Sequence, residues 1–144
     1  MASANLTRKR WRFVYLLNVA QRRVQHFIQS QSSGHTATRA GLLMALAPDR
    51  ATPMGKLGSA LQLGPPAISN LVERACKAGL VVRTPHPEDG RAWLVQLTPA
   101  GAKARKVAVV AARHLNAKLC EGFSDEELDT VARWLTAVQD RFPG

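Results

Sequence analysis

Hydrophobic residues recur at spacings of three and four along most of this chain, a pattern typical of amphipathic helices. The pattern predicts helices over residues 6–31, from Thr36 or Thr38 to Leu46, and over 53–61, 65–78, 99–121 and 125–142. Residues 80–83 and 92–97 are short apolar runs on either side of a turn-rich segment, which predicts two strands. The expected fold is therefore mainly α with a small β-hairpin.

Residues that favour helix ends mark several of these boundaries. Thr52 is expected to cap a short helix that begins at Pro53, and Gly79 suits the left-handed end of the helix over 65–78. Ser124 and Glu127 have the spacing of a capping box at the start of the last helix. The inward-facing positions predicted for the central helices are Leu42, Leu43, Leu46, Leu57, Leu61, Ile68, Leu71, Val72 and Ala75.

The hairpin has a charged tip. Asp89 and Gly90 form the predicted turn, in which Gly90 supplies the positive φ that a tight hairpin needs. Arg91 follows directly behind this turn, and a helix lies on each side of the hairpin. A helix, a hairpin with an arginine at its tip and a second helix form the sequence outline of a winged helix-turn-helix.

The charge of the chain points to a polyanionic partner. Lys and Arg number 20 and Asp and Glu 10, which gives a net charge of +10, and no acidic residue precedes Asp49. This excess favours nucleic acid as the partner first and an anionic membrane surface second. A basic protein with no polyanionic partner is the plain alternative.

Other classes of function are disfavoured because the sequence lacks the motifs and apolar runs that they require. The two cysteines, Cys76 and Cys120, are far apart and form neither a disulfide framework nor a zinc site, which fits a reducing cytoplasm. No apolar run reaches the roughly 20 residues that span a bilayer. There is no phosphate-binding loop, nucleophile elbow, metal-binding histidine pair or dinucleotide-binding turn. We therefore expect neither an enzyme nor a cofactor or metal site.

The helix over 65–78 has the properties that DNA reading requires. Small and polar residues near its start allow a close approach to the major groove. Helix N-termini and nearby side chains supply phosphate contacts, and an arginine at the wing suits the minor groove. The candidate DNA-binding residues are Lys56, Ser59, Pro65, Pro66, Ala67, Ser69, Asn70, Arg74, Lys77 and Arg91.

Residues 52–81, TPMGKLGSALQLGPPAISNLVERACKAGLV, and the wing over 87–101, PEDGRAWLVQLTPAG, resemble the MarR family of bacterial transcriptional regulators (multiple antibiotic resistance regulators). The wing shows the family's acidic-X-arginine element at 89–91. Alternating apolar residues follow, then a leucine-threonine pair, and then Gly101 three residues after Thr98.

The resemblance implies a mainly α winged helix-turn-helix that acts as a homodimer on double-stranded DNA. Residues 35–98 would form the DNA-binding region, and residues 1–34 and 99–144 the helical dimerisation arm. The two half-sites of the DNA would lie about 10 bp apart. Ser69 and Asn70 would face bases or phosphates, Arg74 would contact backbone or base, and Arg91 would enter the minor groove. Asp89 would hold the Arg91 loop by a charge-assisted hydrogen bond.

Members of this family often bind aromatic carboxylates near the dimer arm. By this resemblance Arg22, His26, His35 and Arg39 are candidates for holding a small aromatic or anionic effector. The arginines can equally form a solvated face or contact phosphate, and each histidine can be an ordinary surface or packed residue. The sequence leaves these alternatives open.

The sequence thus predicts a cytoplasmic, homodimeric transcriptional regulator, a repressor that binds a pseudo-palindromic operator and is released by a small ligand. The alternative is a winged-helix module that binds DNA without sequence preference, or binds another protein, and has no ligand response. A first helix lying on an anionic membrane is a further alternative, although no membrane partner is expected of a regulator.

Overall fold

The computed structural model describes residues 12–31 and 37–143. The chain divides into two units, Met1–Arg39 and Ala40–Gly144. The first unit holds α2 (Phe13–Gln31) and the first turn of α3 (Ala37–Ala45), so the long first helix is confirmed over the residues described. Residues 6–11 of that prediction, and Thr36 as a cap, lie outside the described residues. Thr38 lies inside α3 and is not its cap.

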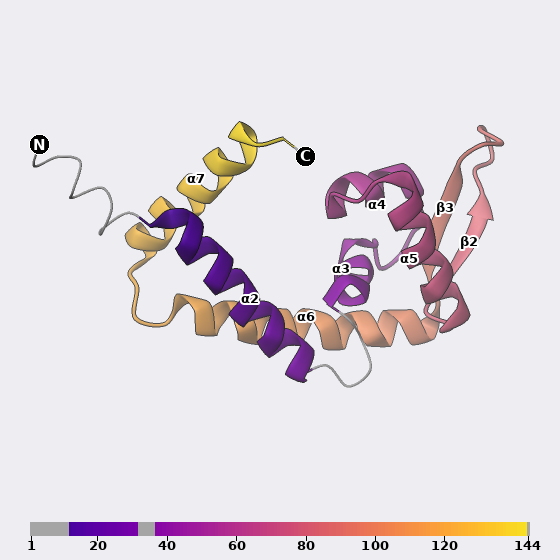
Figure 1. Ribbon diagram of the computed structural model, residues 1–144. Helices are drawn as coiled ribbons and strands as arrows, with labels where there is room; N and C mark the ends of the chain where they lie inside the picture. The colour runs from indigo at the N-terminus through magenta and orange to yellow at the C-terminus, as the bar shows by residue number, and fades with distance from the viewer. Residues whose placement is uncertain (1–11, 32–36, 144) are drawn as a thin grey trace, which may run out of the picture. The chain divides into compact units, whose positions relative to one another are not determined.

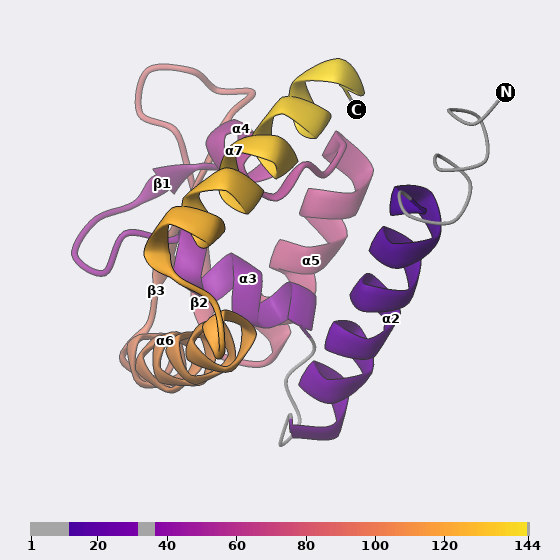
Figure 2. The same ribbon diagram turned by 90° about the vertical axis from the view of Figure 1, so that its left-hand side faces the viewer.

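Over its described residues, the second unit contains the rest of α3, four further helices and three short strands (Figure 1). Its elements in chain order are β1 (Thr52–Pro53), α4 (Met54–Leu61), α5 (Pro65–Lys77), β2 (Val81–Pro85), β3 (Trp93–Leu97), α6 (Pro99–Cys120) and α7 (Asp125–Arg141). The fold is mainly α with one small sheet, as the sequence predicts. Figure 2, which looks along α6, shows α3 and the strands on the same side of that helix.

One apolar core joins α3, α4 and α5 to the hairpin. Every inward position predicted for these helices is buried except Leu61, which is half-buried at the edge of the core. The core consists of Leu42, Leu43, Leu46, Leu57, Ile68, Leu71, Val72, Ala75, Leu80, Val81 and Val95. Because α5 buries one face here, its opposite face is exposed.

The sheet has a third strand that the sequence analysis missed. Its order is β1-β3-β2, all antiparallel, with Thr52 opposite Val95 and Pro53 opposite Leu94. The prediction that Thr52 caps α4 and Pro53 begins it is therefore wrong, since α4 begins at Met54. Pairing with β3 overrides the local helix-start signal, and a proline is tolerated because β1 is an edge strand.

The chain leaves α5 through a left-handed glycine, as predicted. Gly79 has a φ of 74°. Its N–H donates to the carbonyl of Cys76, and the N–H of Leu80 donates to the carbonyl of Ala75, both at 3.0 Å. These two bonds make a Schellman motif, which turns the chain directly from α5 into the wing.

The wing tip differs from the predicted tight turn. The N–H of His86 donates to the carbonyl of Ala92 at 3.0 Å, so the connection is a longer loop. Within it the N–H of Ala92 donates to the carbonyl of Asp89 at 3.0 Å, which closes a turn with aspartate at its first position. Gly90 does not have a positive φ, and that prediction is wrong because this turn does not require one.

Thr98 and Gly101 fix the start of α6 against the hairpin. Thr98 Oγ1 accepts a hydrogen bond from the N–H of Gly101 at 3.0 Å and donates one to the carbonyl of Gly79 at 2.6 Å. A Cβ at Gly101 would overlap the carbonyl oxygen of Leu80 and lie 2.8 Å from its carbon. The threonine and glycine of the wing motif therefore have structural reasons for their spacing.

Replacing Thr98 with valine is expected to lower the free energy of unfolding by about 1–2 kcal/mol, because both hydroxyl bonds are lost at a helix cap. Thr98→Ser keeps the hydroxyl and should remain close to the wild type. Chemical denaturation at one fixed protein concentration measures both variants. A valine variant as stable as the wild type would show that these bonds contribute nothing net.

The last helix begins at the predicted capping box. Ser124 Oγ accepts a hydrogen bond from the N–H of Glu127 at 3.2 Å, and the N–H of Ser124 donates to Glu127 Oε2 at 2.9 Å. Acidic residues in this first turn also suit the positive end of the helix dipole. The capping box therefore fixes where α7 starts.

Candidate nucleic-acid interface

Helices α4 and α5 form a helix-turn-helix whose turn is held by backbone geometry. Gln62 ends α4 with a left-handed φ of 52°, and the N–H of Leu63 donates to the carbonyl of Gly58 at 2.9 Å. The first two residues of α5, Pro65 and Pro66, have no N–H to offer to a phosphate. Anion binding at this helix start therefore depends on side chains more than the sequence analysis assumed.

The candidate DNA-binding residues lie on the surface of α4, α5 and the wing. All of them are exposed except Ser69, which is half-buried. Two already have partners within the chain. Ser59 Oγ donates to the carbonyl of Gly55 at 3.1 Å, and Lys77 Nζ lies 3.3 Å from Glu73 Oε1 in an exposed pair. An exposed pair of this kind is weak and salt-sensitive, so a phosphate can compete for Lys77.

Arg91 stands on a wing turn that Asp89 organises. Asp89 Oδ1 accepts a hydrogen bond from the backbone N–H of Arg91 at 3.1 Å, which leaves the guanidinium of this exposed residue available. Arg91 and Trp93 form the wing side of an open hollow. The α4–α5 segment forms its other side with residues that include Gly58, Gln62 and Pro65. The wing arginine and the start of α5 therefore border one depression.

Sequence reasoning missed a pair of residues on the wing. The Cζ of Arg83 lies 4.5 Å from the centroid of the Trp93 ring, a cation–π contact. Arg83 is opposite Val95 and Pro85 is opposite Trp93, so Arg83 and Trp93 are diagonal neighbours on one face of the hairpin. Alternation alone gives the face of each residue, but their contact depends on a register that the sequence did not supply.

The residues predicted to hold a ligand are placed only in part. Arg22 and His26 are exposed and lie four residues apart on α2, which puts them on one face of that helix. Arg39 is half-buried in the first turn of α3, and His35 lies outside the described residues.

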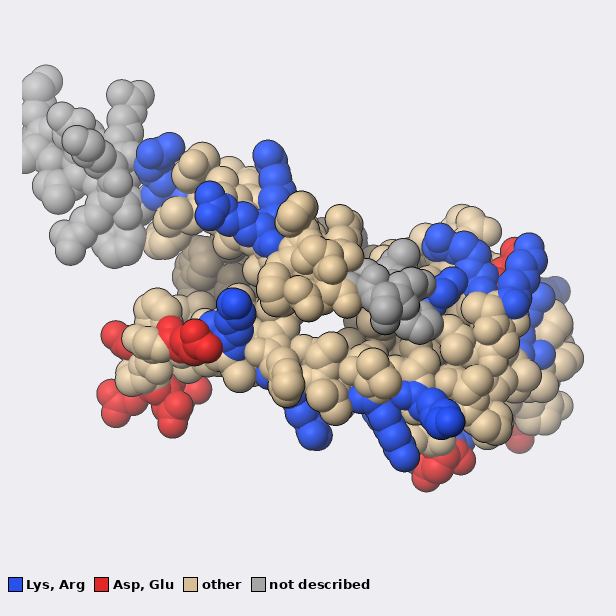
Figure 3. Space-filling model, turned by 90° about the horizontal axis from the view of Figure 1, so that it is seen from below, with Lys and Arg blue, Asp and Glu red and all other residues tan. Residues whose placement is uncertain are grey.

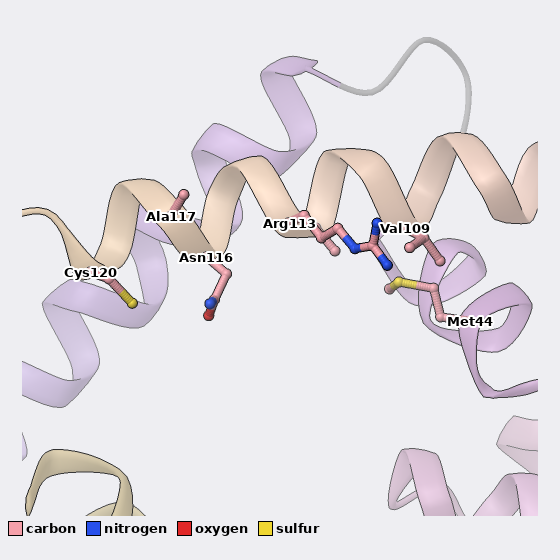
Figure 4. Close-up of a pocket in the computed structure, with 7 residues that line it drawn as sticks. Met44, Val109, Arg113, Asn116, Ala117 and Cys120 are labelled. Atoms are coloured by element: carbon pink, nitrogen blue, oxygen red, sulfur yellow. The ribbon is translucent and has the colours of Figure 1, made fainter. Parts of the chain in front are cut away.

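The structure contains a groove along α6 that the sequence analysis did not predict. Arg113 and Asn116 are its polar groups, and its walls are mostly apolar (Figure 4). The Arg113 side chain extends along the helix toward Met44 of α3. The remaining lining residues are Val109, Ala112, Ala117 and Cys120. Arg113, Asn116 and Ala117 are exposed, so this groove is open to solvent.

Charge is separated along the second unit. Figure 3 shows basic side chains along the α6 face and acidic side chains gathered where α7 begins. Between 12–31 and 37–143 no cluster of three His, Cys, Asp or Glu is placed to hold a metal ion. Over the same residues no helix is long and apolar enough to cross a membrane.

Comparison with known proteins relates this helix-turn-helix and wing to a protein family. The model of the MarR family matches residues 33–92, a range that includes α3 and ends in the wing loop directly before β3. Residues 33–92 are a MarR-family winged-helix domain. The match covers α4, α5, Asp89 and Arg91, the residues from which the interface is built.

Solved structures extend the similarity beyond the MarR-family domain. A probable transcriptional regulator from Pseudomonas aeruginosa is 29% identical, with a TM-score of 0.78 over 89% of this chain and 97% of its own. BpsR of Bordetella bronchiseptica, whose DNA binding is regulated by 6-hydroxynicotinic acid, is 23% identical (TM-score 0.81, covering 90% and 94%). MepR of S. aureus, solved with DNA, is 20% identical (TM-score 0.82, covering 92% and 99%). No curated protein matches the sequence.

Proposed function

We propose that this chain is a transcriptional repressor that binds a pseudo-palindromic operator in double-stranded DNA as a homodimer in the cytoplasm. The observation that carries the proposal is the exposed face of α5 beside an exposed wing arginine, within a MarR-family domain. The net charge of +10 supplies the attraction to phosphates. Regulation of transcription, and not catalysis, is the role that these features support.

Each part of the interface has a role on DNA. The small residues Pro66 and Ala67 let α5 approach the base edges closely, and Asn70 can exchange hydrogen bonds with a base or a phosphate. Arg74 and Lys56 carry the charges that favour phosphate contact. Arg91 enters the minor groove from the wing, where its guanidinium gains from the negative potential.

The apolar faces of the outer helices support the homodimer. In the described residues neither α2 nor α7 has a buried side chain. Large apolar side chains nevertheless stand exposed on α2, α6 and α7 and directly after α7, and they include Val14, Tyr15, Leu16, Val107, Val110, Leu119, Val131, Leu135 and Phe142. Apolar area of this extent is typical of a protein–protein interface. A second copy would cover it and supply the second winged helix.

A small aromatic or anionic effector is the proposed regulator of DNA binding. The groove beside Arg113 supports this, because it combines an apolar wall with one cation. The regulation of BpsR by 6-hydroxynicotinic acid gives an example of such a molecule in a protein of the same fold. Arg22, His26, His35 and Arg39 remain the alternative ligand contacts that family resemblance suggests.

Replacing Arg91 with alanine is expected to weaken binding to the preferred duplex by about 1–3 kcal/mol, the size of a single specific contact. Lys106→Ala, which removes a positive charge from the exposed surface of α6, is the matched control and should change affinity little. Titration of a labelled duplex at fixed salt measures both. Equal affinities for wild type and Arg91→Ala, with the fold intact, would remove Arg91 from the interface.

The charge of the chain also favours a second candidate, a non-specific DNA-binding protein. Such a protein shows only the salt-dependent phosphate contribution and binds all duplexes alike. A specific regulator prefers its site by roughly a thousandfold or more. Titration of a preferred and a scrambled duplex at the same salt concentration separates the two functions.

A further inference from the structure

We propose that Trp93, held in place by Arg83, is a positioning residue that sets where Arg91 stands relative to α5. The inference rests on the proposed DNA-binding function and adds two residues to it. Neither residue is one of the candidate DNA-binding residues, and neither needs to contact DNA for the proposal to hold.

The first support is the packing between the strands. Arg83 on β2 and Trp93 on β3 are diagonal neighbours, with the guanidinium Cζ 4.5 Å from the ring centroid. Below them Val81 and Val95 are buried in the core, whereas the tip beyond Trp93 is exposed apart from the half-buried Ala92 and His86. The Arg83–Trp93 contact thus lies at the tip end of this face, where Pro85 opposite Trp93 forms the last register pair before the loop.

The second support is the position of the ring. Trp93 lines the hollow that Arg91 and Ala92 also line from the wing, opposite Gly58, Pro65 and Ile68 of the helix-turn-helix. Trp93 is 38% exposed, so part of the residue packs against the protein at the edge of this hollow. A smaller side chain there would widen the hollow and leave Arg83 without its ring.

The position of the wing matters because Arg91 and α5 would contact DNA on opposite sides of one backbone strand. An arginine in the minor groove and a helix in the adjacent major groove must be separated by the width of the backbone between them. A wing that shifts relative to α5 loses the specific contact of Arg91 but keeps its charge. The expected defect is therefore in discrimination between duplexes more than in binding to DNA of any sequence.

The test is a double-mutant cycle that combines Trp93→Leu with Arg91→Ala, measured on a preferred and a scrambled duplex. Alone, Arg91→Ala should weaken preferred binding by about 5- to 150-fold, and Trp93→Leu by about 3- to 10-fold. In the Trp93→Leu background the loss from Arg91→Ala should shrink by at least about twofold. Binding to the scrambled duplex should be nearly the same with Trp93→Leu as with the wild type.

Two further variants separate positioning from general stability. Trp93→Phe keeps a ring under Arg83 and should restore most of the affinity, whereas Arg83→Met removes only the cation and should show the same coupling as Trp93→Leu. Because Arg83 is exposed, Arg83→Met keeps the test valid if Trp93→Leu unfolds. The matched control is Val82→Ala, which changes an exposed apolar side chain on the opposite face of the hairpin. Any loss of affinity that it causes should simply add to the loss from Arg91→Ala.

If the affinity losses of Trp93→Leu and Arg83→Met simply add to the loss from Arg91→Ala, the positioning role is overturned. The proposed function still stands in that case, provided that Arg91→Ala weakens binding to the preferred duplex. If Arg91→Ala has no effect and both duplexes bind equally, the proposed function itself is wrong and the positioning role is overturned with it.

Discussion

Replacing Gly101 with alanine is expected to lower the free energy of unfolding by about 3 kcal/mol, at the upper end of the range for overpacked sites. The new Cβ would overlap the carbonyl oxygen of Leu80 and lie 3.2 Å from Leu97 Cδ2. The obstructing atom is backbone in the α5–β2 connection and cannot rotate away. Either α6 or the hairpin must move, and the Thr98 bonds that join them would be strained.

Thermal unfolding at one fixed protein concentration measures this effect, with an expected fall in Tm of about 6–12 °C. Gly90→Ala is the matched control. No atom lies within 4 Å of a Cβ at that position and its φ is not positive, so its effect should stay within about 0.5 kcal/mol. A Gly101→Ala variant as stable as the wild type would show that the α6–hairpin contact is looser than the structure indicates.

Replacing Leu135 with aspartate is expected to give monomers and to reduce specific DNA binding to the non-specific level, a loss of roughly a thousandfold or more. Leu135 is 38% exposed in the single chain and belongs to the apolar stripe of α7 with Val131, which Phe142 continues directly after the helix. A carboxylate buried in an apolar interface without a partner is strongly unfavourable. Monomers carry one winged helix and cannot hold two half-sites together.

Analytical ultracentrifugation gives the oligomeric state of this variant, and a duplex titration gives its affinity. Thr130→Asp is the control, because it adds the same charge at an exposed position on the opposite side of α7. This control should remain dimeric and bind DNA as the wild type does. A folded Leu135→Asp dimer with full specific affinity would show that α7 is not part of the dimerisation arm.

The sequence predicted those parts of the fold that local chemistry determines. The inward positions of α5 follow from helical spacing, Gly79 from the need for a left-handed residue, and the α7 start from the Ser124–Glu127 capping box. Each of these signals lies within one element or at its end. They needed no knowledge of what the element contacts.

The features that the sequence did not predict depend on pairing between distant segments. Thr52 and Pro53 carry a helix-start signal, but their pairing with β3 makes them a strand. The Arg83–Trp93 contact depends on the β2–β3 register, and the need for glycine at 101 depends on the close approach of Leu80. The candidate interface was predicted residue by residue from helix faces, whereas the hollow between the wing and α5 required the folded chain.

The most direct test of the central claim is selection from a library of randomised duplexes at about physiological salt, followed by sequencing of what the protein retains. The proposed function predicts enrichment of an inverted repeat whose half-sites lie about one helical turn apart. Retained duplexes without any shared motif would contradict it and assign the chain to non-specific DNA binding.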